Sequence, residues 1–307
     1  MESVNFALLG GDDIASTLGK SGTRTDLALY DRKESGTIRT WVVPAGFPEK
    51  IQPLFQAVNL GEYAILHVGT LDRFAGEQIL ALDYMGVTGG ILSHSSMVDH
   101  DSLIRAVRGT AVEGYEFVEP SGLREATSGF APARRDGDPR VVIDHCFDVK
   151  GAGTIALGKV VSGTISKHDC MVLAPSGIDV NIKSIQMHDN PVDEARSPAR
   201  VGLALKGVKP QDVSRGDLLC ATGSAPPATA EVRLDLAKTP FYKGEPSPNQ
   251  MCMLSVGLQM VPAKFASVDP VVLALDRPAA CSPGERCAVL KPDSPGVRIM
   301  GGGRILE

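Results

Sequence analysis

The hydrophobic pattern of the chain changes near residue 138, and this change separates an α/β part from an all-β part. In the first part, short apolar runs at 5–9, 63–68 and 90–92 alternate with segments at 49–60 and 74–85, where apolar residues recur every three or four positions. Buried strands that alternate with amphipathic helices are typical of a parallel α/β sheet. We therefore predict an α/β domain over residues 1–125.

The rest of the chain carries short β-branched runs separated by glycine-rich turns. These runs lie at 141–143, 154–161, 170–173, 180–185 and 201–205, and residues 230–307 are again rich in such runs. This spacing predicts two β-barrels, at 138–222 and 228–307. Residues 121–138 and 221–228 lack periodicity and are rich in turn-forming residues, so we predict a linker at each place.

Charge and hydropathy exclude several classes of partner. Residues 1–130 have a net charge of −7 and residues 131–307 a net charge of +2, which argues against DNA or any general polyanion as partner. The longest uncharged segment, 246–263, contains three prolines and is predicted to form a strand with turns rather than a membrane span. The first residues lack the basic start and apolar core of a signal peptide.

The six cysteines are scattered and form no Cys-x-x-Cys pair. This pattern gives no zinc-ligand spacing, so we predict no metal site. Reduced core cysteines in a cytoplasmic protein are the expected state.

Residues 141–219 resemble the second domain of the elongation factor Tu family. The shared pattern runs through Lys-Gly-x-Gly-Thr, Ser-Gly-Thr, Ser-Ile-Gln, Lys-Gly-Val and Arg-Gly-Asp, and residues 298–306 resemble the last strand of that family's third domain. The archaeal members, the selenocysteine-specific factor and the gamma subunit of initiation factor 2, are the most similar in character. The resemblance implies a reduced GTPase-like α/β domain followed by two β-barrels, which is the translation elongation factor architecture.

The family's phosphate loop, Gly-x-x-x-x-Gly-Lys-Ser/Thr, holds phosphates with backbone N–H groups and a lysine, and holds Mg²⁺ with a hydroxyl. After the strand at 5–9 this chain has Gly10, Gly11, Asp12 and Asp13. The lysine and hydroxyl are missing, and two carboxylates stand where phosphate charge would lie. We expect the two aspartates to cap the following helix, with a lone metal ion as the alternative.

Gly19-Lys20-Ser21 resembles the second half of the phosphate-loop motif. The first glycine of a complete motif would be at position 14, which is Ile14. The tripeptide also lies beyond the helix that is predicted to follow the loop. We interpret it as the segment that leads from that helix toward the family's first switch.

The family's Asp-x-Pro-Gly-His motif has its counterpart at 42–47. Pro44 and Gly46 remain, but Val42 replaces the aspartate that serves Mg²⁺ and Phe47 replaces the histidine that positions water. By the same resemblance, the Gly46 amide would face the γ-phosphate.

The guanine-reading motif Asn-Lys-x-Asp has its counterpart at Ser93, His94 and Ser96. The carboxylate that pairs with the guanine N–H groups is therefore absent. His94 with Asp99 could form a replacement polar site, and a solvated loop at the sheet edge is the simpler interpretation.

The binding free energy lost with these contacts is large enough to decide whether a nucleotide binds. A charge-assisted hydrogen bond contributes about 1.5–3 kcal/mol, so four lost contacts remove roughly 6–12 kcal/mol, or about four to eight decades of affinity. Non-additivity blurs this figure without changing its direction. We predict a pseudo-GTPase with no nucleotide cofactor, no metal and no catalytic residue.

Candidate RNA-binding cations lie in the barrels. In the family the barrels hold the acceptor end of aminoacyl-tRNA, and the resemblance points to Lys206, Lys209, Arg215 and Lys264. Arg215 belongs to the Arg-Gly-Asp segment that lies near the tRNA 5′ end in the family. The competing interpretation is a solvated surface with a structural Arg215, because a net charge of +2 is weak for an RNA-binding half.

Three functions follow from this sequence. The favoured one is a non-catalytic relative of translation factors that binds aminoacyl-tRNA, the ribosome or a translation-factor protein as a regulator. The alternatives are an active elongation-factor-type GTPase with atypical motifs, and a non-translational interaction protein that reuses the scaffold. Without a nucleotide to shift populations, we expect one dominant arrangement of the domains.

Overall fold

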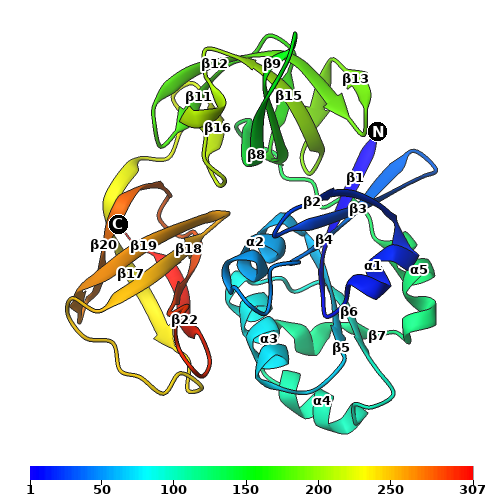
Figure 1. Cartoon of the computed structure of the whole chain (residues 1–307), viewed down its shortest axis with the longest axis vertical. Coiled ribbons are helices and arrows are strands. Elements are labelled where there is room, and N and C mark those ends of the chain that lie inside the picture. The colour runs from blue at the N-terminus through cyan, green and yellow to red at the C-terminus, as the bar shows by residue number, and fades with distance from the viewer. Residues whose placement is uncertain (307) are drawn as a thin grey trace.

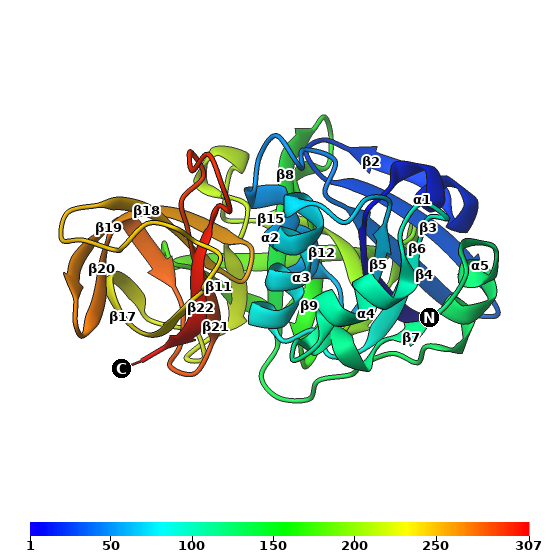
Figure 2. The ribbon, with the colours of Figure 1, turned by 90° about the horizontal axis from the view of Figure 1, so that it is seen from below.

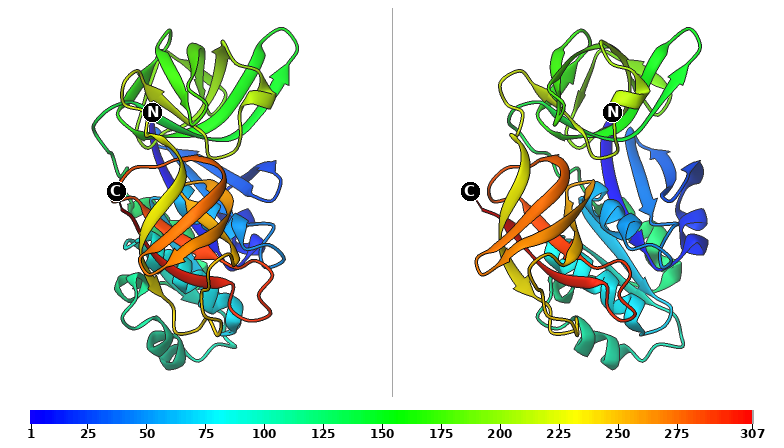
Figure 3. Two further views of the ribbon diagram at one scale, coloured as in Figure 1. Left: turned by 90° about the vertical axis from the view of Figure 1, so that its left-hand side faces the viewer. Right: turned by 60° about the vertical axis from the view of Figure 1, so that its left-hand side comes forward.

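The computed structural model describes residues 1–306, and the side chain of Asp12 lies outside this description. Three domains follow one another along the chain (Figure 1): an α/β domain, a β-barrel at the top of the view and a second barrel on the left. We call them the first, second and third domains. Figure 3 shows the second domain above the other two. The predicted fold class, an α/β domain followed by two β-barrels, is confirmed.

The first domain is built on a seven-stranded sheet of order β2-β3-β4-β1-β5-β6-β7. Parallel pairing joins β4, β1, β5, β6 and β7, while β2 and β3 extend the sheet as an antiparallel edge. The strands are β1 (Glu2–Leu9), β2 (Lys20–Arg24), β3 (Ala28–Glu34), β4 (Thr37–Val43), β5 (Tyr63–Val68), β6 (Gly90–His94) and β7 (Glu116–Phe117). The α-helices are α1 (Asp12–Leu18), α2 (Gln52–Leu60), α3 (Arg73–Met85), α4 (His100–Val107) and α5 (Leu123–Ala126).

Local sequence explains where the two long helices begin and end. The Asp72 carboxylate accepts hydrogen bonds from the Phe74 and Ala75 amides at 2.8 and 3.0 Å, so it caps α3. Gly86 ends that helix in the left-handed region at φ 68°. Helix α2 begins at Gln52 rather than at 49 as predicted, because residues 44–49 form turns and Pro53 lies in the first helical turn.

The linker predicted from residue 121 is wrong in its first half. Short helical turns at Pro120–Gly122, Leu123–Ala126 and Thr127–Gly129 continue the first domain. Leu123 is fully buried, and the Phe130 ring packs edge-on against Phe6 and Tyr63 at 5.3 and 4.7 Å between ring centroids. Leu123 and Phe130 are isolated apolar residues among many turn-forming ones. They produce no helical or strand periodicity in the sequence, so the pattern indicates a linker.

The second domain is a six-stranded barrel closed by pairing of β11 with β12, in the order β11-β16-β8-β9-β15-β12. Its strands are β8 (Arg140–Val149), β9 (Gly153–Ser162), β11 (Cys170–Ala174), β12 (Ile178–Met187), β15 (Arg200–Lys206) and β16 (Leu218–Ala221). Three short strands accompany the barrel: β10 (Thr164–Ser166), β13 (Asn190–Val192) and β14 (Glu194–Arg196).

The third domain is a closed barrel of order β17-β20-β19-β18-β21-β22. Its strands are β17 (Ala228–Lys238), β18 (Met251–Val256), β19 (Gln259–Val268), β20 (Val271–Ala280), β21 (Arg286–Leu290) and β22 (Ile299–Ile305). The segment 246–263 thus holds β18 and the start of β19. Within residues 1–306, no helix has the length and apolar character needed to span a membrane.

The six cysteines are free thiols, and four of them are buried: Cys220, Cys252, Cys281 and Cys287. The expectation of core cysteines is wrong for Cys170, which is exposed at the start of β11 with its thiol against the Asn181 side chain. Cys146 is half-buried.

The domains share hydrophobic cores instead of touching only through polar surfaces. Ala288, Leu290 and Ile299 of the third domain belong to the same cluster as the apolar faces of α2 and α3. Figure 2 shows these two helices on the side of the first domain that faces the barrels. The Tyr84 ring of α3 rests against the Gly302 backbone, where a Cβ atom would be only 2.1 Å away. The shared cores favour one fixed arrangement of the three domains.

Candidate functional site

The connection from β1 to α1 is only two residues long. Gly10 has a φ of 104°, and a Cβ atom there would lie 1.6 Å from the His67 carbonyl oxygen of β5. The connection therefore lies directly against β5, and it has too few residues to wrap phosphates as a motif of about eight residues does. Gly19 follows the end of α1, and Lys20 opens β2 beyond that helix.

The expected capping role of Asp13 is wrong. Gly11 occupies the N-cap position of α1 in an extended conformation, and no side chain makes a cap hydrogen bond there. Asp13 is exposed inside the first helical turn, two residues past the N-cap position from which a side chain accepts hydrogen bonds from the free amides. The side chain of Asp12 lies outside the described residues.

The loop after β4 is tied to protein atoms. The Gly46 amide donates a 2.9 Å hydrogen bond to the Asp26 carbonyl oxygen. The Phe47 ring packs edge-on against Phe74 at 5.9 Å, and the Arg298 guanidinium lies 5.5 Å from the Phe47 ring centroid. The position that the family resemblance assigns to a water-positioning histidine is therefore an aromatic anchor.

Four of the candidate positions, Gly10, Gly11, Pro44 and Phe47, line one cavity of about 280 Å³. Its remaining lining consists of Val43, Ala45, Pro48, Phe74 and Gln78. Among these described residues none is lysine, arginine, serine or threonine. This volume is slightly below the range of about 300–1,000 Å³ that is usual for ligand sites, and the cavity offers no cation to a phosphate.

The three positions of the guanine-reading motif, Ser93, His94 and Ser96, do not line that cavity and lie at the end of β6. Ser93 is buried, Ser96 is exposed, and the His94 Nε2 atom lies 3.2 Å from the His100 Nδ1 atom. Asp99 caps α4 by accepting a 2.9 Å hydrogen bond from the Ser102 amide. In the described part of the chain, no group of three potential ligands is placed to hold a metal ion.

Arg215 joins the first and second domains. Its Nη1 atom lies 2.8 Å from both carboxylate oxygens of Asp26 and 3.0 Å from the Gln56 side-chain oxygen. Burial by itself raises the pKa of Asp26, but the Arg215 guanidinium outweighs it and the net pKa is lowered. These contacts favour the structural interpretation of Arg215.

The remaining RNA-binding candidates, Lys206, Lys209 and Lys264, are exposed on β15, the loop after it and β19. None of these three lysines lines any of the cavities described here. Instead, Lys50 and Arg277, which the sequence analysis missed, line with Arg215 an open cavity of about 430 Å³ where the three domains meet. No spacing in the sequence connects these cations.

A buried ion pair clamps the end of α2 to the second domain. The Lys159 ammonium of β9 lies 2.8 Å from the Glu62 carboxylate and donates to the Leu60 and Asn59 carbonyls at 2.8 and 3.3 Å. Both side chains are about one-twentieth exposed, at 6% and 5%. The cation thereby satisfies carbonyls that the helix leaves unpaired and lies at the negative end of the helix dipole.

A second buried ion pair clamps α3 to the third domain. The Arg298 Nε and Nη2 atoms donate to the Glu77 carboxylate at 3.1 and 2.5 Å. Arg298 also donates to the Pro48 carbonyl at 2.6 Å, and Glu77 is fully buried. This pair therefore fixes both α3 and the loop after β4.

A third cavity, of about 460 Å³, lies between the β2–β3 edge and the second domain. Its cations include Lys20 and Arg200, and Arg200 pairs with the buried Asp144 carboxylate. Burial raises the pKa of Asp144, but Arg200 and His145 outweigh it and the net pKa is lowered.

Comparison with known proteins places these features in context. The family model for elongation factor Tu domain 2 matches residues 153–220. An uncharacterized protein of Methanocaldococcus jannaschii is 32% identical over 99% of this chain and all of its own length. Elongation factor 1-alpha of Nanoarchaeum equitans is 28% identical over 75% of this chain, which corresponds to 58% of that factor.

The whole chain also superposes on translation elongation factor SelB from Methanococcus maripaludis, crystallised in complex with the GTP analogue GppNHp. The TM-score is 0.83 with 20% sequence identity, and the match covers 100% of this chain and 79% of SelB. At this identity the similarity establishes the fold alone.

Proposed function

The chain belongs to the elongation factor Tu and SelB-like family, and on this premise we propose that it is a translation elongation factor-like protein that neither binds nor hydrolyses GTP. It acts in the cytoplasm by binding tRNA, the ribosome or a translation protein, as a regulator or competitor of active factors. No residue of the chain has a catalytic role in this proposal.

The observation that carries the proposal is the composition of the cavity beside Gly10 and Gly11. A triphosphate would enter it without a lysine, an arginine or a hydroxyl among the described lining residues. The Gly46 amide, which would face the γ-phosphate in the family, already donates to Asp26. A phosphate that loses hydration without gaining a cation or hydroxyl partner loses binding free energy, so guanine nucleotides would bind no tighter than millimolar.

The proposal also accounts for the closed arrangement of the domains. In the family, GTP makes the first domain clamp onto the barrels. Here Arg215, Lys159 and Arg298 each join a barrel to the first domain through a carboxylate. Because these contacts use only protein atoms, one arrangement persists without a ligand.

The binding part of the proposal rests on the cations at the domain junction. Phosphates and 2′-hydroxyls of RNA are recognised by arginine and lysine on a shape-matched face. Lys50 and Arg277 flank Arg215 there and belong to the first and third domains. An acceptor stem bound at this junction would contact all three domains.

We expect the Lys50→Glu/Arg277→Glu variant to bind tRNA at least about tenfold more weakly than the unaltered protein near 0.1 M salt, with a shallower salt dependence. Fluorescently labelled tRNA and ribosomes are titrated with the full chain. Lys33→Glu, an exposed reversal on β3, serves as the matched control. Lys206→Glu/Lys209→Glu tests the cations that the sequence suggested.

Equal affinity for RNA in the unaltered protein and its three variants, or no measurable RNA binding by any of them, would contradict the proposal that the chain binds RNA. The non-translational interaction protein would then become the favoured function.

A further inference from the structure

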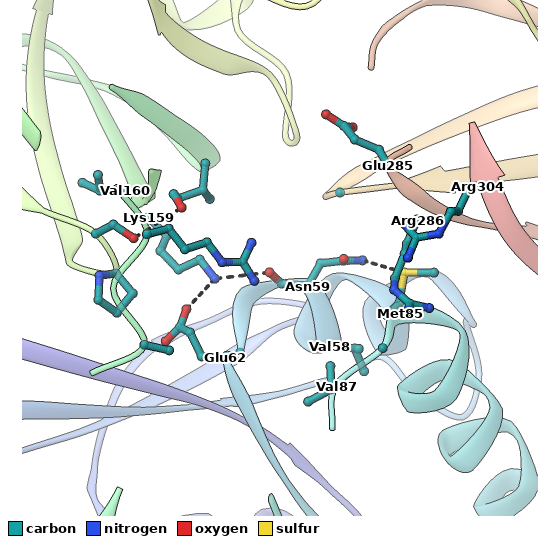
Figure 4. A pocket seen from close by; sticks show the side chains of 18 residues that line it. Val58, Asn59, Glu62, Met85, Val87, Lys159, Val160, Glu285, Arg286 and Arg304 are labelled. Atoms are coloured by element: carbon teal, nitrogen blue, oxygen red, sulfur yellow. Dashed lines mark hydrogen bonds and ion pairs between the residues drawn. The ribbon is translucent and has the colours of Figure 1, made fainter. Parts of the chain in front are cut away.

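A fourth cavity, of about 440 Å³, lies where the carboxyl ends of α2 and α3 meet both barrels and the linker before β8. Figure 4 shows Lys159 and Glu62 on one side of it, Arg286 and Arg304 on the other, and Asn59 and Met85 between them. We call it the basic junction cavity. It is distinct from the cavity beside Gly10 and from the one that contains Lys50, with which it shares no lining residue.

The side-chain charges around the basic junction cavity do not balance, and the partial negative charge at the carboxyl ends of α2 and α3 offsets only part of the excess. Its lining holds four cations, Arg135, Lys159, Arg286 and Arg304, and two carboxylates, Glu62 and Glu285. Both carboxylates are already engaged, Glu62 with Lys159 at 2.8 Å and Glu285 with Arg140 at 3.5 Å. Among residues 1–306, none of the three lining arginines has an ion pair.

Two of these arginines face each other across neighbouring strands. Arg286 of β21 is directly opposite Arg304 of β22 in the strand register. Like charges at directly opposed positions destabilise a sheet. Asp235 of β17 is opposite Arg304 on its other side but forms no ion pair with it in the described structure. An anion between the two arginines would therefore relieve their repulsion.

Backbone carbonyls hold the two guanidinium groups in place. Arg286 Nη1 donates to the Tyr84 carbonyl at 3.2 Å, and its guanidinium lies against Gly86, where a Cβ atom would be 2.5 Å away. Arg304 Nη1 donates to the Gly284 carbonyl. A guanidinium has five N–H donors, so each retains several for a ligand.

Arg135 supplies a third cation from the linker. Arg135 and Lys159 line the same cavity. Burial lowers the pKa of Lys159, and the charge of Arg135 adds to this lowering. In the described structure the Arg135 side chain makes no hydrogen bond.

We propose that the basic junction cavity binds a small phosphate-bearing anion, held between Arg135 and the Arg286–Arg304 pair. Guanidinium groups match phosphate oxygens in geometry and charge. The volume lies within the range of small-molecule sites, whereas a continuing RNA strand would require an open groove. This site goes beyond the proposed function, because it does not involve the guanine-nucleotide positions.

The test measures thermal unfolding of the full chain with inorganic tripolyphosphate and with pyrophosphate. We expect tripolyphosphate at about 1 mM to raise Tm by about 2–4 °C, because a ligand that binds only the folded chain stabilises it. Arg286→Gln/Arg304→Gln and Arg135→Gln should each remove this shift. Arg233→Gln, an exposed arginine on β17, should keep it.

Absence of a shift at about 10 mM tripolyphosphate, or an equal shift in all variants, would overturn the proposal. A 5′-phosphorylated RNA oligonucleotide forms the second arm: tighter binding of the RNA, lost in the same variants, would overturn the small-molecule ligand in favour of an RNA end. Should the double variant fail to fold, Arg135→Gln alone decides, because its side chain makes no hydrogen bond that folding requires. Failure of this site leaves the guanine-nucleotide question untouched, since none of these arginines lines the cavity beside Gly10.

Discussion

Replacing Glu77 with alanine is expected to lower the free energy of unfolding by about 3–5 kcal/mol, because the substitution leaves the Arg298 guanidinium buried without its carboxylate. Glu77 is fully buried and accepts hydrogen bonds from both the amide and the guanidinium of Arg298. The loss is measured by urea denaturation of the full chain. Glu49→Ala, an exposed glutamate near α2, is the matched control and should stay within about 0.5 kcal/mol.

A paired substitution separates the charge effect from simple loss of packing. Glu77→Leu with Arg298→Met replaces both ions with apolar groups of similar size, and such replacements of buried pairs are often neutral or better. We therefore expect the double variant to recover most of the lost stability. A cost below about 1 kcal/mol for Glu77→Ala would contradict the buried clamp between α3 and the third domain.

Replacing Lys159 with methionine is expected to cost a similar amount, about 3–5 kcal/mol, and to loosen the contact between the first and second domains. The Glu62 carboxylate would remain buried without its cation, and the Asn59 and Leu60 carbonyls would lose a donor. Urea denaturation measures the first effect, and the radius of gyration from small-angle scattering measures the second.

Lys183→Met serves as the control for this substitution. Lys183 is an exposed lysine of the same barrel that donates to the Ala152 carbonyl. We expect its removal to leave the scattering profile unchanged. An unchanged profile and unchanged stability for Lys159→Met would show that α2 is not held by this cation.

The fold could be predicted from the sequence because its signals are local. The strand at Tyr63–Val68 was predicted with both bounds, since a buried parallel strand is a continuous apolar run between polar residues. The helical turns at 120–129 escaped prediction because they depend on burial of Leu123 and Phe130 against distant parts of the domain. Such tertiary contacts produce no hydrophobic periodicity in the local sequence.

The clamps between domains could not be predicted, for the same physical reason. Glu77 interrupts the apolar face of α3, and a charge at such a position is a sign of a buried partner. Its partner Arg298, however, is 221 residues away in the sequence. Sequence-spacing rules apply only to residues that are close along the chain. The resemblance to a family could therefore suggest that the first domain packs on the barrels, but it could not identify the residues that join them.

The candidate site divides in the same way. The substitutions at Val42, Phe47 and Ser96 could be identified from motifs, because a motif is a local spacing of chemical groups. The sequence did not reveal that the Gly46 amide donates a hydrogen bond to the Asp26 carbonyl oxygen. It also did not reveal that Arg135, Arg286 and Arg304 line one cavity. Both depend on folding of segments that lie far apart.

Titration calorimetry with GTP and GDP in the presence of Mg²⁺ tests the central claim most directly. The protein is first checked for nucleotide carried over from purification, and ATP is titrated in parallel to measure guanine selectivity. The Arg286→Gln/Arg304→Gln variant is included, so that phosphate binding at the basic junction cavity is not mistaken for a guanine site. We predict no guanine-selective heat up to about 1 mM ligand in either protein. Micromolar binding of GTP or GDP that ATP does not match, and that persists in the variant, would contradict the account and favour an active elongation-factor-type GTPase.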